Sequence, residues 1–345
     1  MNFLHAPGTI LVSLGKKARW LAALLAVSSA LSLEAAPLDE LRSLSLFPRI
    51  DRARLERGEI RTERGDLGDF PRGIYLEACY FIHAPMEVVG DALLHWDPVA
   101  HKDADARLYR EFSPPPTAED FESLRLNRAI ARDQWLLQET ARVAQGGASE
   151  DLHLTREEHE IIRRQAKNPN EAWREILKRR SETLSERGLS AVAPYRSEEA
   201  ISPASEFRGL LTLAPKAAQH FAPVTGAQPL SAIGKPADET VGYWEASTVR
   251  NHTALQLGIS AAQKKVDSWQ LIDCIYYPSD TYFMSLNLYQ LWPMDGGTLV
   301  WQVSFVSAPF RSYLGGIDRF VAGKQMTQET IDTAKAFRRD LERNR

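Results

Sequence analysis

The chain has 345 residues, of which 44% are hydrophobic and 25% are charged. This length and composition indicate a globular protein with one large core or two smaller ones, and they exclude a disordered or fibrous chain. With 42 basic and 45 acidic residues the formal net charge is −3. This balance gives no electrostatic reason to expect nucleic acid or an anionic membrane as a partner.

Residues 1–35 have the order of a secretory signal peptide. A basic segment, 16–19, precedes the apolar run 20–33, and the small residues Ala35 and Ala36 follow. The run is shorter than the roughly 20 residues that a spanning helix needs. We therefore expect an exported protein, periplasmic or extracellular, with no integral membrane segment after signal removal. An uncleaved N-terminal anchor is the alternative.

The segment 36–72 is charged and rich in turns, and we expect it to wrap the surface. From residue 73 to the end, 73–345, we expect one α+β domain. It opens with a strand from Ile74 to His83, because β-branched and aromatic residues dominate there. Pro85 then suits the first turn of a short amphipathic helix.

The two cysteines, and a group of histidines and aspartates, each allow two structural interpretations. Cys79 and Cys274 both lie in predicted strands, so they form either one disulfide between neighbouring strands or two buried thiols. His and Asp residues cluster after the first helix, and we interpret them as a polar loop rather than a metal site, because no ligand spacing is present. These loop residues are His95, Asp97, His101, Asp103 and Asp105.

Residues 114–237 form a predicted helical insertion within the domain. Three prolines from Pro114 mark its start, and helical patterns with polar outer faces follow. Thr155 and Glu158 have the spacing of a capping box, and Gly188 is typical of a helix end. We interpret this region as an insertion and not as an independent catalytic domain.

Five strands are predicted after the insertion. Apolar and polar residues alternate along them, which indicates an antiparallel sheet with one covered face and argues against a doubly wound parallel sheet. On the strand near residue 286 we expect Leu286 and Leu288 to point inward, and Ser285 and Asn287 outward. The predicted strands are Tyr243–Val249, Thr253–Ser260, Trp269–Tyr277, Thr281–Leu291 and Thr298–Val306.

A long amphipathic helix is predicted from Ile317 to Arg343. On a helical wheel, Thr327 falls near the middle of its apolar stripe and Lys324 on the shoulder. Either these residues meet water, a polar partner or a ligand, or a bend near Gly323 turns them outward. The predicted stripe comprises Ile317, Phe320, Val321, Ile331, Ala334, Phe337 and Leu341.

The segments IYLEACYFIHAPMEVVGDALLHWDP and GGTLVWQVSFVS, the latter followed by a helix, carry a resemblance to a known fold. They are similar to the opening strand and helix, and to the last strand, of the START-like (SRPBCC, helix-grip) proteins. The resemblance covers about half of the chain after the signal, and the insertion is additional to it. It implies a curved antiparallel sheet gripping the C-terminal helix, and binding of lipids, sterols or other apolar molecules.

We therefore predict an exported, non-catalytic protein that binds an apolar or amphipathic, lipid-like molecule between the sheet and the C-terminal helix. The predicted ligand-binding residues are Leu286, Leu288, Trp301, Phe305, Phe320, Lys324, Thr327 and Ile331. The alternatives are a solid core without ligand, and an envelope scaffold or protein-interaction module that uses the insertion.

Enzymatic activity is the third possibility. The sequence has no GxSxG, P-loop, GxGxxG or HExxH motif, and we predict no catalytic residue, metal or cofactor. Paired carboxylates such as Glu77 and Asp97 would become candidates only if both lined a pocket.

Overall fold

The early strand of the chain lies beside its last strand. Strand β2 (Gly73–Ile82) is antiparallel to β8 (Gly297–Ser307), with Gly73 opposite Ser307 and Ile82 opposite Thr298. The structure, a computed structural model, describes residues 36–101, 105–147, 149–195, 201–310 and 317–343. The predicted signal peptide, 1–35, lies outside these residues.

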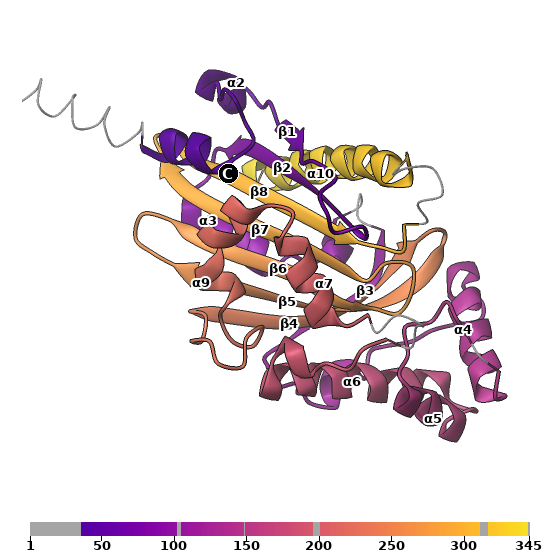
Figure 1. The fold of residues 1–345 in the computed structure, drawn as a ribbon. Coiled ribbons are helices and arrows are strands. Elements are labelled where there is room, and N and C mark those ends of the chain that lie inside the picture. The colour runs from indigo at the N-terminus through magenta and orange to yellow at the C-terminus, as the bar shows by residue number, and fades with distance from the viewer. Residues whose placement is uncertain (1–35, 102–104, 148, 196–200, 311–316, 344–345) are drawn as a thin grey trace, which may run out of the picture.

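Eight strands form one curved antiparallel sheet in the order β1-β2-β8-β7-β6-β5-β4-β3 (Figure 1). The predicted fold class, an α+β chain with an antiparallel sheet and a long C-terminal helix, is confirmed. The remaining strands are β1 (Arg61–Arg64), β3 (Ala106–Phe112), β4 (Glu239–Val249), β5 (His252–Lys264), β6 (Trp269–Pro278) and β7 (Met284–Met294).

Tight turns join two pairs of the late strands. Arg250 and Asn251, with φ of 47° and 71°, connect β4 to β5, and Gly296, with φ of 83°, lies in the turn from β7 to β8. Positive φ at the centre of a two-residue hairpin matches the right-handed twist of the strands, so consecutive strands pair directly.

Helices occur in four parts of the chain. An N-terminal part contains α2 (Arg52–Glu56), and α3 (Met86–Leu94) with the short 3₁₀ helix η1 (Pro98–Ala100) comes after β2. The last element is α10 (Ile317–Arg343). The insertion between β3 and β4 holds η2 (Glu119–Phe121), α4 (Ala131–Ala144), α5 (Arg156–Arg164), α6 (Pro169–Arg187), η3 (Leu189–Ala191), α7 (Pro203–Leu211), α8 (Pro215–His220) and α9 (Ala222–Thr225).

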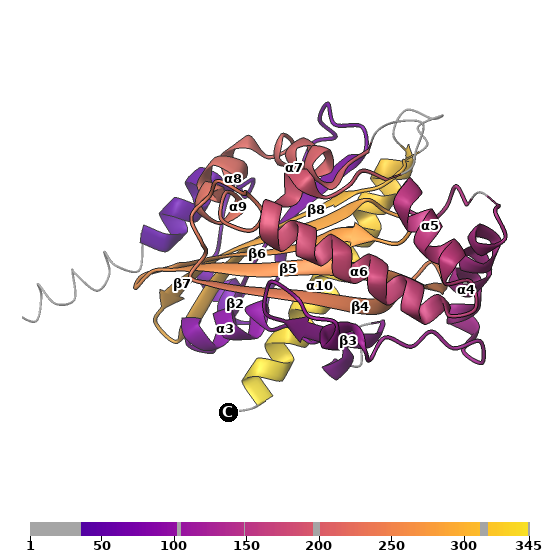
Figure 2. The ribbon, with the colours of Figure 1, turned by 90° about the horizontal axis from the view of Figure 1, so that it is seen from below.

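The insertion covers the apolar face of the sheet. Leu286, Leu288, Trp301 and Phe305 share one buried cluster with insertion residues, and the rings of Trp301 and Phe221 are 5.4 Å apart. Figures 1 and 2 show α7 and α9 on this face, and α3 and α10 on the other. The expectation of a single covered face is therefore wrong, because α3 and α10 cover the other face, where Val89, Leu291 and Phe337 belong to a second apolar cluster.

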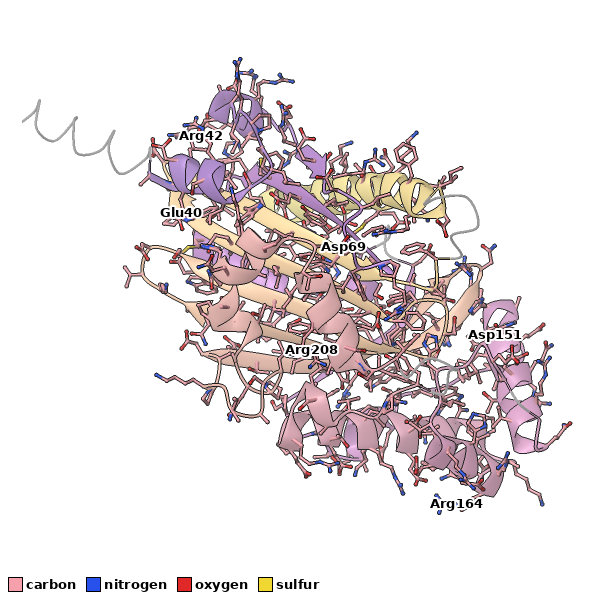
Figure 3. All side chains as sticks on the ribbon, viewed as in Figure 1. Glu40, Arg42, Asp69, Asp151, Arg164 and Arg208 are labelled. Atoms are coloured by element: carbon pink, nitrogen blue, oxygen red, sulfur yellow. The ribbon has the colours of Figure 1, made fainter. Side chains whose placement is uncertain are left out.

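Buried hydrogen bonds connect the insertion to the sheet. Glu206 on α7 is fully buried, where its carboxylate accepts hydrogen bonds from Arg72 Nη2 at 2.9 Å and from Ser307 Oγ. The predicted capping box at Thr155 and Glu158 is present at the start of α5. Exposed charges, such as Arg164 and Arg208, lie on the outer faces of the helices (Figure 3).

The N-terminal segment 36–72 contributes to the core as well as to the surface. Leu41 and Phe47 are buried in the same cluster as the insertion. Leu46 N donates to Glu77 Oε2 at 2.9 Å, and Trp301 Nε1 donates to the same oxygen at 3.1 Å. Burial raises the pKa of the Glu77 carboxyl to about 7, and these two donors oppose the rise.

Cys79 and Cys274 are free and buried, so the structure shows the thiol alternative. Burial raises the pKa of the Cys79 thiol to about 12, which makes it a poor nucleophile at neutral pH. Among the helices of the described residues, none has the length and apolar content to cross a membrane.

We predict that the two faces of β7 respond differently to truncation. Leu288→Ala should lower the free energy of unfolding by about 2–5 kcal/mol, because it opens a void under the insertion. Ser285→Ala, on the other face of the same strand, should change it by less than about 1 kcal/mol. Urea denaturation measures both, and equal losses would contradict the assignment of faces.

Candidate functional site

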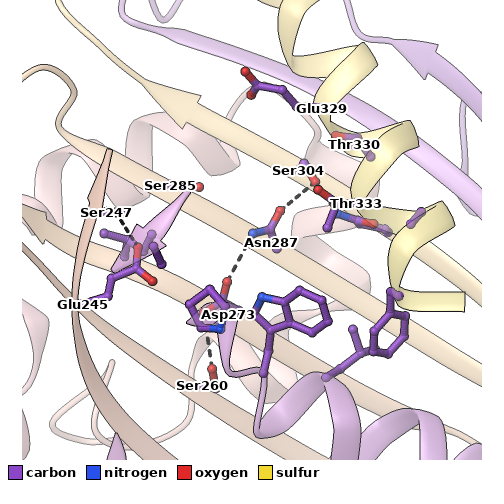
Figure 4. A pocket seen from close by; sticks show the side chains of 18 of the residues that line it. Glu245, Ser247, Ser260, Asp273, Ser285, Asn287, Ser304, Glu329, Thr330 and Thr333 are labelled. Atoms are coloured by element: carbon purple, nitrogen blue, oxygen red, sulfur yellow. Dashed lines mark hydrogen bonds between the residues drawn. The ribbon is translucent and has the colours of Figure 1, made fainter. Parts of the chain in front are cut away.

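A cavity of about 420 Å³ lies between the sheet and the helices α3 and α10 (Figure 4). Every strand from β2 to β8 contributes at least one side chain to its floor. Helix α10 packs on β1 and β2, near one edge of the sheet, and α3 packs on β5 to β8. The volume falls within the range of small-molecule sites, roughly 300–1,000 Å³.

Strand alternation makes this floor polar. Ser285, Asn287 and Tyr289 on β7 point into the cavity, and Leu286 and Leu288 between them point to the insertion. The same holds on β8, where Gln302 and Ser304 line the cavity. The sheet therefore separates an apolar core from a polar chamber.

A chain of hydrogen bonds crosses the floor from β2 to β6. Tyr80 Oη donates to Gln302 Oε1 at 3.4 Å, and Gln302 Nε2 donates to Ser304 Oγ at 2.9 Å. Ser304 Oγ donates to Asn287 Oδ1 at 2.7 Å, and Asn287 Nδ2 donates to Asp273 Oδ2 at 3.3 Å (Figure 4). Each group orients the next, so the network ends on a carboxylate whose position is set by the sheet.

Asp273 is also held from the neighbouring strands. Tyr243 Oη donates to Asp273 Oδ1 at 2.6 Å, and Ser260 Oγ donates to the same oxygen at 3.3 Å. Gly258 on β5 leaves room for the Tyr243 ring that donates to Asp273, because a Cβ at residue 258 would lie 1.9 Å from this ring. Burial raises the pKa of Asp273, and its donors from Tyr243, Asn287 and Ser260 oppose the rise.

Glu245 is the second carboxyl group of the floor. Burial raises its pKa to about 7, Ser247 Oγ opposes this by donating a hydrogen bond at 2.9 Å, and the charge of Asp273 adds to the rise. Asp105 and Glu329 complete the acidic lining, and among the described lining residues there is no Lys, Arg or His. The cavity therefore has a surplus of acceptors and of negative charge.

The opposite wall of the cavity is largely apolar. Leu93 and Trp96 come from the α3 side, and Met326 and Phe337 come from α10. The Trp96 ring stacks on His101 with centroids 3.8 Å apart and meets the edge of Phe337 at 5.5 Å. These contacts connect the loop after α3 to α10, so the wall is built from two elements that pack on each other.

None of the eight predicted ligand-binding residues lines this cavity. Leu286, Leu288, Trp301 and Phe305 lie on the opposite face of the sheet, so the inward direction assigned to them toward α10 was wrong. The physical reason is that the insertion, and not α10, covers the apolar face. Ligand binding by these residues stays a prediction.

The predicted residues of α10 have other surroundings. The ring of Phe320 is half exposed and carries the cations of Arg64 and Lys324 at 4.6 and 4.8 Å. Thr327 Oγ1 donates to Gly323 O of its own helix at 2.7 Å, and Ile331 is partly buried away from the cavity lining. Thr330 and Thr333 line the cavity instead, together with Ala334 and Phe337 of the predicted stripe. The stripe of α10 that faces the sheet is therefore rotated relative to the predicted one and shares Ala334 and Phe337 with it.

The described residues of the polar loop after α3 lie apart and have separate partners. Asp97 accepts from Val99 N at 2.8 Å and caps η1, and Glu77 lies on the insertion side, so this pair shares no pocket. His95 lies 3.1 Å from Glu111 and 3.2 Å from Glu239; burial opposes protonation, but these hydrogen bonds outweigh it and raise the pKa of His95. Asp103 lies outside the described residues, among which no group of three or more His, Cys, Asp or Glu could hold a metal ion.

Comparisons with known proteins do not establish a family for this chain. No family model and no curated protein matches this chain. A solved structure, "Crystal structure of Ara h 8.0201", matches 29% of this chain and 65% of that chain, with 11% identity and a TM-score of 0.20. At this TM-score the match carries no argument, so the α+β fold class is established by the structure and START-like membership stays a prediction.

The Glu245 carboxyl should make stability depend on pH. A folded-state pKa of about 7, against 4.5 for the free group, means that the folded state holds the proton more tightly between these values. Stability should fall as the pH rises through 7, and Glu245→Gln should reduce the loss between pH 5 and 8 by up to about 3 kcal/mol. Urea denaturation at both pH values tests this. Glu329→Gln, at an exposed residue of the cavity lining, is the control and should leave the loss unchanged.

Proposed function

We propose that the protein binds an amphipathic small molecule with a hydrogen-bond-donating, cationic head group in the cavity between the sheet and α10. The observation that supports this most is the division of the cavity into an acceptor-rich floor and an apolar wall. The head group would meet Glu245 and Asp273, and the apolar body would lie against Met326 and Phe337.

Charge decides the nature of the head group. Four carboxyl groups line the cavity without a basic residue among the described lining residues. A bound anion would be repelled, and a bound alkane would leave the carboxyl groups desolvated without compensation. An ammonium group would supply both donors and positive charge, and aromatic side chains such as Trp96 and Tyr243 add favourable faces for a cation.

This proposal narrows the lipid-like ligand predicted from the sequence. An amphipathic molecule remains compatible with the cavity, because the α3 side and α10 add apolar side chains to its lining: Leu93, Trp96, Met326, Ala334 and Phe337. A sterol or triglyceride without a donor group is disfavoured by the floor. Export to the periplasm or outside the cell is an additional proposal, and it depends on the signal-like residues 1–35.

The experiment compares three ligands with the same chain and different heads: octylamine, octanol and octanoate. We expect octylamine to bind most tightly and octanoate least, as measured by isothermal titration calorimetry at pH 7.5. Glu245→Gln should weaken octylamine binding about tenfold or more, because a charged partner is lost. Octanol binding should change little.

Val88→Ala is the matched control, since this exposed residue on the outer side of α3 touches neither the cavity nor the core. It should bind all three ligands as the unmodified protein does. Equal affinity for octanoate and octylamine, or undiminished octylamine binding by Glu245→Gln, would overturn the proposed function.

A further inference from the structure

A second cleft, of about 980 Å³, lies at the end of the sheet where the β4–β5 turn and the β6–β7 loop meet the insertion. The loop between α4 and α5 contributes Asp151, which Figure 3 labels, and His153. The first turns of α10 close another side. None of its lining residues belongs to the cavity described above.

His252 in this cleft is oriented by a buried carboxylate. Its Nε2 lies 2.7 Å from Asp280 Oδ1, and the Asp280 side chain is 1% exposed. Asp280 also accepts from Ser279 Oγ at 2.9 Å and from Thr281 Oγ1. A carboxylate in this position requires the proton on Nε2, so the lone pair of the neutral ring is on Nδ1. No described residue forms a hydrogen bond with Nδ1.

Aromatic packing fixes the plane of the same ring. Trp135 of α4 packs on His252 with ring centroids 4.0 Å apart. Together with Asp280, this leaves the imidazole little freedom to rotate. In general-base catalysis, one imidazole nitrogen accepts the proton while a carboxylate holds the other nitrogen. His252 and Asp280 have this arrangement.

His153 is a second imidazole of the cleft wall. It is 9% exposed, its ring centroid is 4.8 Å from that of Tyr195 and 5.2 Å from that of Phe283, and its Nδ1 is 3.0 Å from Pro278 O. The carbonyl accepts the Nδ1 proton, so Nε2 carries a lone pair that no described residue uses. Burial lowers the pKa of His153 to about 4, so this ring stays a neutral acceptor at pH 7.

The backbone beside Asp280 is strained. Thr281 has a φ of 70°, which is rare for a β-branched residue and strains the backbone. Its hydroxyl is used to hold the Asp280 carboxylate. Strain of this kind persists where the surrounding structure imposes it, and here it accompanies the residue that orients His252.

We propose that this cleft hydrolyses carboxylic esters, with His252 as the general base for an attacking water and Asp280 as its positioning residue. His252 Nδ1 takes a proton from water as the water oxygen bonds to the ester carbonyl carbon. The carbon–oxygen bond to the alcohol then breaks, and the proton on Nδ1 passes to the departing oxygen. The products are an acid and an alcohol, and water is the other reactant.

The lining of the cleft limits the substrate class. Glu150, Asp151 and Asp318 disfavour an anionic substrate, whereas Phe283 and Val321 offer apolar surface to an acyl chain. Arg250 is the basic side chain among the described lining residues and would face the charge that develops on the carbonyl oxygen. We therefore expect uncharged esters of short acyl chains.

The test is hydrolysis of p-nitrophenyl butyrate by the full chain at pH 7.5. His252→Ala should lower kcat/KM by about 100-fold or more, and free imidazole should restore part of the rate by occupying the vacated space. Asp280→Asn should lower kcat with little change in KM, because the substrate is bound by other groups. Thermal unfolding confirms that each variant is folded.

His83→Ala is the control for hydrolysis by any surface imidazole. His83 is exposed and lies outside the cleft, so this variant should keep the full rate. The proposal is overturned if the unmodified protein hydrolyses the ester no faster than His252→Ala. It is also overturned if His83→Ala loses as much activity as His252→Ala, or if imidazole restores nothing.

Discussion

The alternation of side chains along the strands is the constraint on which the rest of the structure depends. Because neighbouring residues point to opposite faces, one face of the sheet joins the apolar core under the insertion, and the other combines a second apolar cluster with the polar floor of the cavity. The insertion supplies the apolar cover with Phe221 and its neighbours. Helices α3 and α10 supply the other cover, and they leave a chamber because serine, asparagine and carboxylate side chains do not pack into a dry core.

Much of the fold could be predicted from the sequence. Period-two patterns identified all five late strands, and the composition of residues 74–82 identified β2, because these signals are local. Strand β1 was missed, since Arg61–Arg64 carries no apolar pattern and pairs only at an edge. The capping box of α5 was also found, because two side chains three residues apart suffice to form it.

The candidate site was not predicted, and the reason is physical. Alternation shows that Leu288 and Asn287 face opposite ways, but it does not show which helix covers which face. That depends on where an insertion of more than a hundred residues folds back, which is a long-range packing question. A useful signal was present in Asp273 and Glu245: carboxylates inside strands of a sheet with helices on both sides indicate a polar chamber.

The pairing of β2 with β8 has a consequence for how the chain acquires its structure. Strand β2 can pair with β8 only when β8, the last strand of the chain, is available. The sheet is therefore completed by contacts between residues far apart in the sequence. Such a topology folds slowly, because the connecting chain loses entropy before these contacts form. A chain that ends before residue 297 would leave β2 and β7 with unpaired edges, and such edges template aggregation.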